Sequence, residues 1–133
     1  MTTIDPNFNN DHINNLRRIF PESWFNRINF VPTKSENAIP MMGNFDMIYI
    51  DGDHTYEGVK KDWELCRERW NKVVLFDDYH MPSKNQKDIE CAKLIDQIEN
   101  DSKELIILDR RIFVDDRKMK DEEIDYGQVI MTK

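Results

Sequence analysis

Two short acidic motifs have residue types suited to proton transfer and to metal binding. The first is Asp51–His54, which reads Asp-Gly-Asp-His, and the second is the pair Asp77-Asp78. Histidine is the side chain suited to moving a proton near neutral pH. Carboxylates in one cleft repel each other unless a cation lies between them, and oxygen ligands suit Mg²⁺, Mn²⁺ or Ca²⁺. The candidate base is His54, and the candidate metal ligands are Asp51, Asp77 and Asp78.

Each motif also has a plainer interpretation. Asp53 or Thr55 could cap a following helix and leave the histidine beside it solvated. The chain has 26 acidic residues, so pairs such as Asp115-Asp116 arise by chance. What separates Asp77-Asp78 from that pair is its position directly after an apolar run. His80 is a second candidate base or ligand.

The apolar pattern predicts the elements that position these motifs. Strands and amphipathic helices alternate, which indicates an α/β fold with a mainly parallel sheet. The last two strands have no helix between them and are expected to form an antiparallel edge. The strand at 45–50 is nearly continuous in apolar residues, so we expect it to be buried on both faces. Strands are expected at 2–5, 28–31, 45–50, 73–76, 105–108 and 127–131, and helices from a cap at Asn10 or Asp11 to Phe20, from Tyr56 to Trp70 and from Gln86 to Glu99.

In a parallel sheet, ligands bind beyond the carboxyl ends of the strands. That rule selects Asp5, the segment Asp51–His54 and the segment Asp77–His80. An acid placed like Asp5 commonly holds the hydroxyl pair of a ribose, although an aspartate before a proline is also a common turn residue. The candidate ligands thus fall at the ends of three expected strands.

Composition limits the classes of function. The 133 residues are expected to form a single domain over 1–133. The net charge of −7 argues against binding to nucleic acid or to an anionic membrane, since both need Lys and Arg. Two distant cysteines indicate neither a disulfide scaffold nor a thiolate zinc site, and favour the reducing cytoplasm. Only four glycines occur, and none form a GxGxxG or GxxxxGK[ST] phosphate-binding loop.

The run from Phe45 to Trp63, which contains Asp51–His54, resembles the central motif of class I S-adenosylmethionine-dependent methyltransferases. It is closest to their small-molecule and sugar O-methyltransferase branch. The segment Val73–Tyr79 resembles the next strand and acidic pair of that branch. The resemblance implies a Rossmann-like methyltransferase sheet. It also implies S-adenosylmethionine as methyl donor, a small-molecule acceptor, and Mg²⁺ or another divalent cation.

The resemblance assigns roles to individual residues. Asp5 matches the acid that binds the cofactor ribose, and Ser35 falls in the stretch beside the adenine. Asp51, Asp77 and Asp78 match the positions that hold the cation, and Asp51 is also a candidate for cofactor binding. His54 matches the general base.

The resemblance begins at the second strand of the family, so its first strand, glycine-rich loop and first helix have no counterpart. We expect a fragment with impaired cofactor binding rather than a reduced relative, and a sheet gap that favours dimerisation. The alternative is a non-catalytic remnant of the fold that acts as a binding or interaction module. A third interpretation is a phospho-acceptor receiver domain, in which Leu108-Asp109 would mimic the acceptor strand, but the following lysine-bearing strand is missing.

Overall fold

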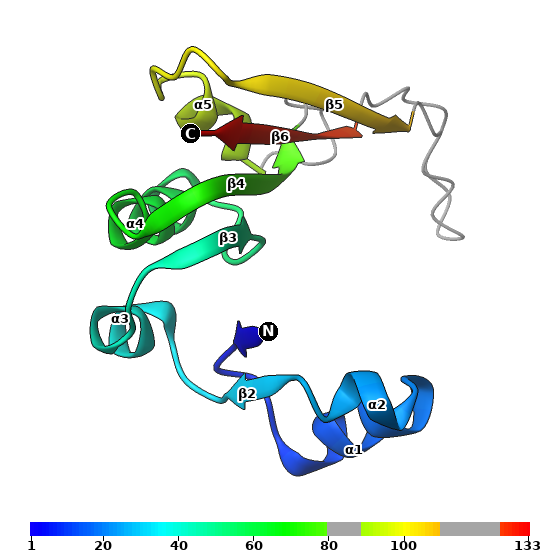
Figure 1. The fold of residues 1–133 in the computed structure, drawn as a ribbon. Helices are drawn as coiled ribbons and strands as arrows, with labels where there is room; N and C mark the ends of the chain where they lie inside the picture. Colours follow the sequence, from blue (N-terminus) through cyan, green and yellow to red (C-terminus); the bar gives the residue numbers. More distant parts are fainter. Residues whose placement is uncertain (80–88, 110–125) are drawn as a thin grey trace. The chain divides into compact units, whose positions relative to one another are not determined.

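The computed structural model describes residues 1–79, 89–109 and 126–133 (Figure 1). Helices and strands alternate over most of these residues, which confirms the α/β class with both parallel and antiparallel strand pairs. The chain divides into two compact units, Met1–Gly43 and Asn44–Lys133, and each is described by itself. The single domain expected over 1–133 stays a prediction.

The first unit is a parallel pair of short strands with helices between and after them. Its order is β1 (Thr2–Ile4), α1 (Asn10–Ile19), α2 (Glu22–Phe25), β2 (Asn29–Val31), α3 (Ser35–Ala38) and the 3₁₀ turn η1 (Ile39–Met41). The cap of α1 lies one residue earlier than predicted. Asn9 caps it by accepting the His12 N–H at 2.9 Å. The helix ends at Ile19 because Pro21 disfavours helical backbone at Phe20.

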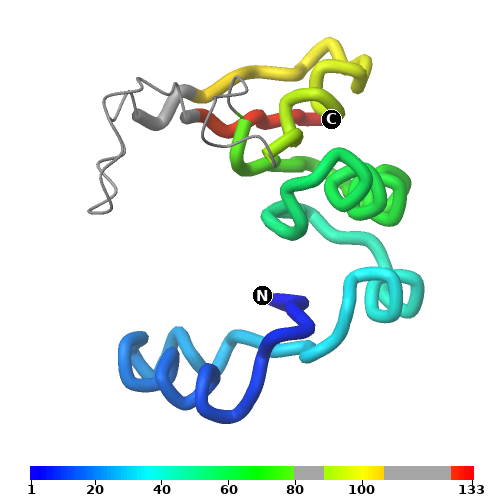
Figure 2. Tube along the Cα trace, turned by 180° about the vertical axis from the view of Figure 1, so that it is seen from behind, coloured from blue at the N-terminus to red at the C-terminus, as the bar shows by residue number. Residues whose placement is uncertain are grey.

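The second unit contains a four-stranded sheet in the order β3-β4-β6-β5. Its elements are β3 (Phe45–Ile50), α4 (Tyr56–Cys66), β4 (Trp70–Tyr79), α5 (Cys91–Ile95), β5 (Glu104–Asp109) and β6 (Tyr126–Thr132). Strands β3 and β4 are parallel, whereas β6 is antiparallel to both of its neighbours, β4 and β5. In Figure 2 the last strand, in red, lies between the green and yellow strands. The predicted antiparallel edge is confirmed.

One face of this sheet packs against helices. Val74, Phe76 and Met131 are fully buried there, and the ring of Trp63 on α4 lies 5.5 Å from the ring of Phe76. Helix α5 packs beside α4 and buries Ile95 completely. The hydrophobic core of this unit therefore lies between the sheet and these two helices.

The expectation that β3 is buried on both faces is wrong. Met47 and Tyr49 are 58% and 47% exposed, whereas Ile50 is buried. Ile50 pairs with Phe76 on the helix-covered face, so the alternating residues Met47 and Tyr49 point to the other face. In addition, β4 is the only strand paired with β3 among the described residues, so β3 is an edge strand.

The second predicted helix is too long. Helix α4 ends at Cys66, and Trp70 opens β4 opposite Phe45 instead of ending the helix. Trp70 is still buried, because a strand end can bury it as well as a helix face. The third predicted helix is shorter as well: α5 stops at Ile95, where Lys103 donates hydrogen bonds to the Ile95 and Ile98 carbonyls. Its predicted start at 86–88 lies outside the described residues. No helix in the described segments is long and apolar enough to cross a membrane.

Candidate active site

The loop after β3 carries the first group of predicted residues. Thr55 caps α4 by accepting the Gly58 N–H at 3.1 Å, and Asp53 accepts the Thr55 N–H at 3.0 Å. Gly58 is required here, because a Cβ atom would lie 2.5 Å from Asp53. Asp53 and Thr55 thus perform the capping that the plainer interpretation gave them. The side chains of Asp51 and His54 are left to face the end of β4.

The imidazole of His54 lies between two carboxylates. Its Nε2 atom is 2.8 Å from Oδ2 of Asp78 and 3.6 Å from Oδ1 of Asp51. Asp78 comes from the end of β4, where its backbone has a φ of +51° and the pairing with β6 shifts register. Aspartate is among the few residues that tolerate this left-handed conformation. The irregular strand end directs the Asp78 side chain toward His54.

Asp77 belongs to a neighbouring hydrogen-bond network. Gln128 on β6 donates its side-chain N–H to Oδ1 of Asp77 at 3.0 Å and to the Tyr49 hydroxyl at 3.2 Å. The Tyr49 hydroxyl donates to Oδ2 of Asp77. Both carboxylate oxygens of Asp77 therefore already accept hydrogen bonds. The structure brings Asp51 and Asp78 around His54, and places Asp77 beside this group in a network of its own.

The carboxylates of the cluster repel one another. Burial raises the pKa of the Asp51 carboxyl, and the negative charges of Asp77 and Asp78 raise it further, against the opposing effect of His54. Burial and the hydrogen bond to Asp77 raise the pKa of the Tyr49 hydroxyl, which keeps it a donor. A positive charge among the carboxylates would relieve their repulsion.

The donor atoms fit a divalent cation. Asp51, His54 and Asp78 each offer one ligand atom, and these atoms lie within 4.8 Å of one another. Two carboxylates and one imidazole suit Mn²⁺, Fe²⁺ or Zn²⁺, and with water ligands also Mg²⁺. His54 was predicted only as a base, so its place among the possible ligands was missed.

The two predicted cofactor residues of the first unit follow neighbouring parallel strands. Asp5 comes directly after β1 and accepts the Asn7 N–H at 2.7 Å, which is the turn role that its plainer interpretation gave it. Ser35 opens α3, shortly after β2. Both residues therefore lie beyond the carboxyl ends of β1 and β2, where ligands of parallel sheets bind.

Sequence reasoning missed Tyr49, Gln128 and Glu90. The signal for Gln128 was available, because it is the only polar side chain in the apolar run 127–131. Glu90 contacts the His54 loop from the start of α5, which no local pattern could indicate. His80, the second candidate base, lies outside the described residues.

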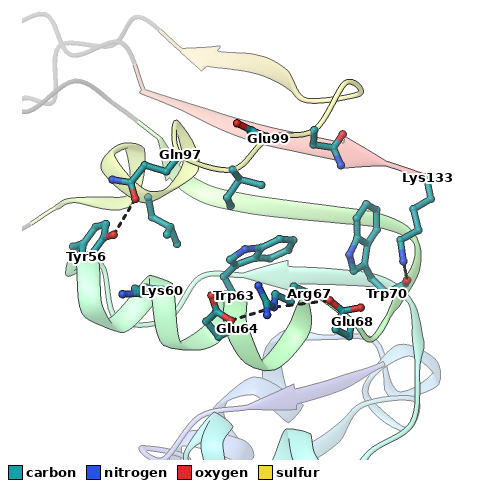
Figure 3. Close-up of a pocket in the computed structure, with 13 residues that line it drawn as sticks. Tyr56, Lys60, Trp63, Glu64, Arg67, Glu68, Trp70, Gln97, Glu99 and Lys133 are labelled. Carbon is teal, nitrogen blue, oxygen red and sulfur yellow. Dashed lines mark hydrogen bonds and ion pairs between the residues drawn. The ribbon is translucent and has the colours of Figure 1, made fainter.

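A separate groove of about 520 Å³ lies between α4 and α5 (Figure 3). Trp63, Trp70 and Lys133 line part of it, and Lys133 donates to the Trp70 carbonyl at 2.7 Å. None of the predicted site residues lines this groove. The candidate site is therefore the cluster at the ends of β3 and β4.

Comparison with known proteins identifies the family. A family model described as a methyltransferase domain matches residues 1–79, which is more than half of the 133 residues. The chain belongs to this methyltransferase family. The matched segment ends at Tyr79 and contains Asp5, Ser35, Asp51, His54, Asp77 and Asp78. No curated protein and no solved structure matches the chain.

Proposed function

We propose that this methyltransferase domain transfers a methyl group from S-adenosylmethionine to a hydroxyl oxygen of a small molecule or sugar. The observation that carries the proposal is the His54 imidazole held between Asp51 and Asp78 at the strand ends. A hydroxyl is a weak nucleophile until its proton is removed, so O-methylation needs a base beside the acceptor. The family match over residues 1–79 supports methyl transfer as the chemistry.

His54 accepts the hydroxyl proton in this proposal. Its Nε2–H can donate to Asp78 at 2.8 Å, which leaves the lone pair of Nδ1 available as the base. Asp78 holds the ring in this tautomer and stabilises the positive charge that develops when the proton arrives. The side chain of Asp78 is only 14% exposed, so solvent screens this interaction weakly.

Asp51 and Asp78 are the proposed ligands of a divalent cation, with Asp77 beside them. The cation would lower the pKa of an acceptor hydroxyl. The hydrogen bonds from Tyr49 and Gln128 hold the Asp77 carboxylate in place. When the cation occupies the cluster, His54 serves either as the base or as a third ligand.

Asp5 and Ser35 are the proposed contacts to the ribose and the adenine of S-adenosylmethionine, and Asp51 is proposed as a further cofactor contact. Methyltransferases of this kind generally use S-adenosylmethionine, which supplies an electrophilic methyl group. Because the sequence carries no glycine-rich loop, we expect weak cofactor binding by this chain alone.

The second candidate function is a non-catalytic binding module, which the absence of a GxGxxG motif from this sequence favours. The two proposals differ in cofactor affinity. A module that binds only a protein partner does not need to bind S-adenosylmethionine, whereas the enzyme must bind it as methyl donor.

Calorimetric titration of the chain with S-adenosylmethionine, with and without Mg²⁺, tests the proposal. Saturable binding, even if weak, that is reduced by Asp5→Ala but not by the control Asp11→Ala would support it. Transfer of isotopically labelled methyl groups to a panel of hydroxyl acceptors would then identify the acceptor class. If a folded sample binds no cofactor, this chain is not an enzyme by itself and the binding module becomes the favoured function.

A further inference from the structure

Glu90 contacts the two peptide groups that follow the proposed base, although it lies 34 residues beyond Tyr56. Its backbone N–H donates to the His54 carbonyl at 2.8 Å, and its carboxylate accepts the Tyr56 N–H at 3.0 Å. We propose that Glu90 is a positioning residue that fixes the orientation of His54. This inference rests on the proposed function, because it gives His54 a role that needs a fixed orientation.

The side chain of Glu90 satisfies a backbone donor that the helix cannot satisfy. Tyr56 is the first residue of α4, so its N–H has no partner within the helix. Thr55 accepts the Gly58 N–H and leaves the Tyr56 N–H to Glu90. A carboxylate at this helix end is also favoured by the helix dipole. Removing the Glu90 carboxylate leaves the partly buried Tyr56 N–H without an acceptor, which favours movement of the loop that carries His54.

The backbone of Glu90 holds the peptide group directly after His54. The His54 carbonyl accepts the Glu90 N–H and also lies 3.7 Å from the thiol sulfur of Cys91. Together with the Tyr56 contact, this holds the two successive peptide groups that follow His54. Because the backbone is held directly after His54, its imidazole keeps its direction toward Asp78 in this proposal.

Further contacts keep Glu90 in place relative to α4. The Tyr56 hydroxyl donates to Gln97 at 2.9 Å, as Figure 3 shows, and the ammonium group of Lys93 lies 4.8 Å from the centre of the Tyr56 ring. Lys93 also pairs with the second carboxylate oxygen of Glu90 at 3.5 Å. These contacts link the start of α4 to α5, and Glu90 is therefore held in place from both helices.

The consequence for catalysis follows from geometry. A displacement of about 1 Å in a reacting group can reduce the rate by about 100-fold, even when binding is unchanged. Loss of the Glu90 carboxylate should therefore lower turnover at saturating substrate while leaving the affinity for S-adenosylmethionine unaltered. Glu90 itself needs no contact with the substrate.

The test compares Glu90→Ala with the conservative Glu90→Gln and the control Glu99→Ala in the full chain. Glutamine keeps an oxygen that can accept the Tyr56 N–H, and Glu99 is an exposed glutamate beyond α5. The first readout is the NMR signal of the His54 imidazole in metal-free protein, assigned by its loss in His54→Ala. His12 in α1 serves as the internal reference.

We expect Glu90→Ala to shift or broaden the His54 signal while the signals of Val74 and Ile95 in the core stay unchanged. Glu90→Gln should restore the His54 signal, and Glu99→Ala should leave it as it is. A folded Glu90→Ala variant with an unaltered His54 signal overturns the proposal. If Glu90→Ala does not fold, Glu90→Gln decides, because the positioning role requires that this variant keep the His54 signal and the protection of the Tyr56 amide from exchange. Loss of either feature in Glu90→Gln would contradict it.

The second readout separates this inference from the proposed function. In an assay with an accepted substrate, Glu90→Ala should lower kcat by about 10- to 100-fold with an unchanged KM for S-adenosylmethionine, and Glu90→Gln should recover most of the loss. If the unmodified protein transfers no methyl group but the NMR result holds, the positioning of His54 stands and the O-methyltransferase function fails. If kcat is unchanged while the His54 signal moves, Glu90 does not position a catalytic group.

Discussion

Nε2 of His54 lies 2.8 Å from Oδ2 of Asp78, and the two residues come from the loop after β3 and the end of β4. This contact joins the two acidic motifs of the sequence into one site. It depends on the parallel pairing of β3 with β4, which places both strand ends at the same edge.

We expect His54→Ala to lower methyl transfer by about 10²- to 10⁴-fold, because general base catalysis typically contributes this much. The affinity for S-adenosylmethionine should stay within about twofold of the original, since His54 is proposed to act on the acceptor. Single-turnover rates and calorimetry measure the two quantities. His12→Ala, an exposed histidine of α1, is the matched control. Equal turnover in the His54 variant would remove His54 from the mechanism.

Replacing Tyr49 by Phe should lower the free energy of unfolding by about 1 kcal/mol, because a half-exposed hydrogen bond to a carboxylate is lost. The effect should be much smaller when Asp77 has already been changed to Asn. Urea denaturation of the two single variants and the double variant gives this coupling. Tyr79→Phe, which removes a hydrogen bond to Asp96, controls for loss of a phenolic hydroxyl elsewhere on β4. Additive effects would show that Tyr49 and Asp77 do not interact in solution.

The raised pKa of Asp51 has a defined effect on stability. The folded chain binds the Asp51 proton more tightly than the unfolded chain, so ionising Asp51 at neutral pH disfavours the folded state. Asp51→Asn should therefore stabilise the metal-free protein at pH 7, by less than about 1 kcal/mol because solvent screens this half-exposed group. The gain should vanish below the unfolded pKa of about 4.

Asp53→Asn is the control, because its expected effect on stability at neutral pH is opposite to that of Asp51→Asn. The backbone hydrogen bond from Thr55 lowers the pKa of Asp53, so its ionised form favours the folded state above the unfolded pKa. The substitution should destabilise the protein at neutral pH, and this loss should shrink as the pH falls. Denaturant unfolding between pH 3 and 8 measures both variants. A destabilised Asp51→Asn at neutral pH would contradict the repulsion within the cluster.

Both cysteines should react slowly in the folded protein. Burial raises the pKa of the Cys66 thiol to about 11 and that of the Cys91 thiol to about 12, so almost no thiolate exists at pH 8. Modification by a thiol reagent should be at least about 100-fold slower than in urea, since protonation and burial act together. Time-resolved mass spectrometry measures both rates. Fast labelling of either thiol in native buffer would mean that the second unit opens readily.

The edge of β3 should promote self-association. Met47 and Tyr49 are exposed on a strand that pairs only with β4 among the described residues, and such edges readily add another strand. We expect a concentration-dependent dimer in sedimentation experiments, and a weaker one for Met47→Lys. Met41→Lys is the control, because Met41 is 89% exposed but lies in a 3₁₀ turn. A stable monomer at high concentration would rule out this contact.

The sequence predicted the strands better than the helices. The strand at 45–50 was predicted with its observed bounds, because a short apolar run followed directly by an acid and a glycine is typical of a strand that ends in a turn. Trp70 was misplaced because its spacing from Trp63 fits a helical stripe, while the strand that includes it is decided by pairing with Phe45. The spacing of residues within one segment does not indicate which distant strand that segment will pair with.

The same distinction applies to the candidate site. His54 and the acids could be predicted because each follows a strand, and strand ends meet at one edge of a parallel sheet. The different surroundings of the Asp77 and Asp78 side chains could not be predicted. They depend on the left-handed backbone of Asp78 and on the hydrogen bonds that Tyr49 and Gln128 donate to Asp77.

The position of β6 between β4 and β5 has a consequence for synthesis of the protein. When the ribosome has completed β5, the strand that separates it from β4 has not yet been made. Until residues 126–132 emerge, the exposed backbone of β4 and the apolar strand β5 both lack their partner. Such unpaired strands are prone to aggregate, and their long-range pairing is slow. The nascent chain should therefore depend on chaperones until its last strand is inserted.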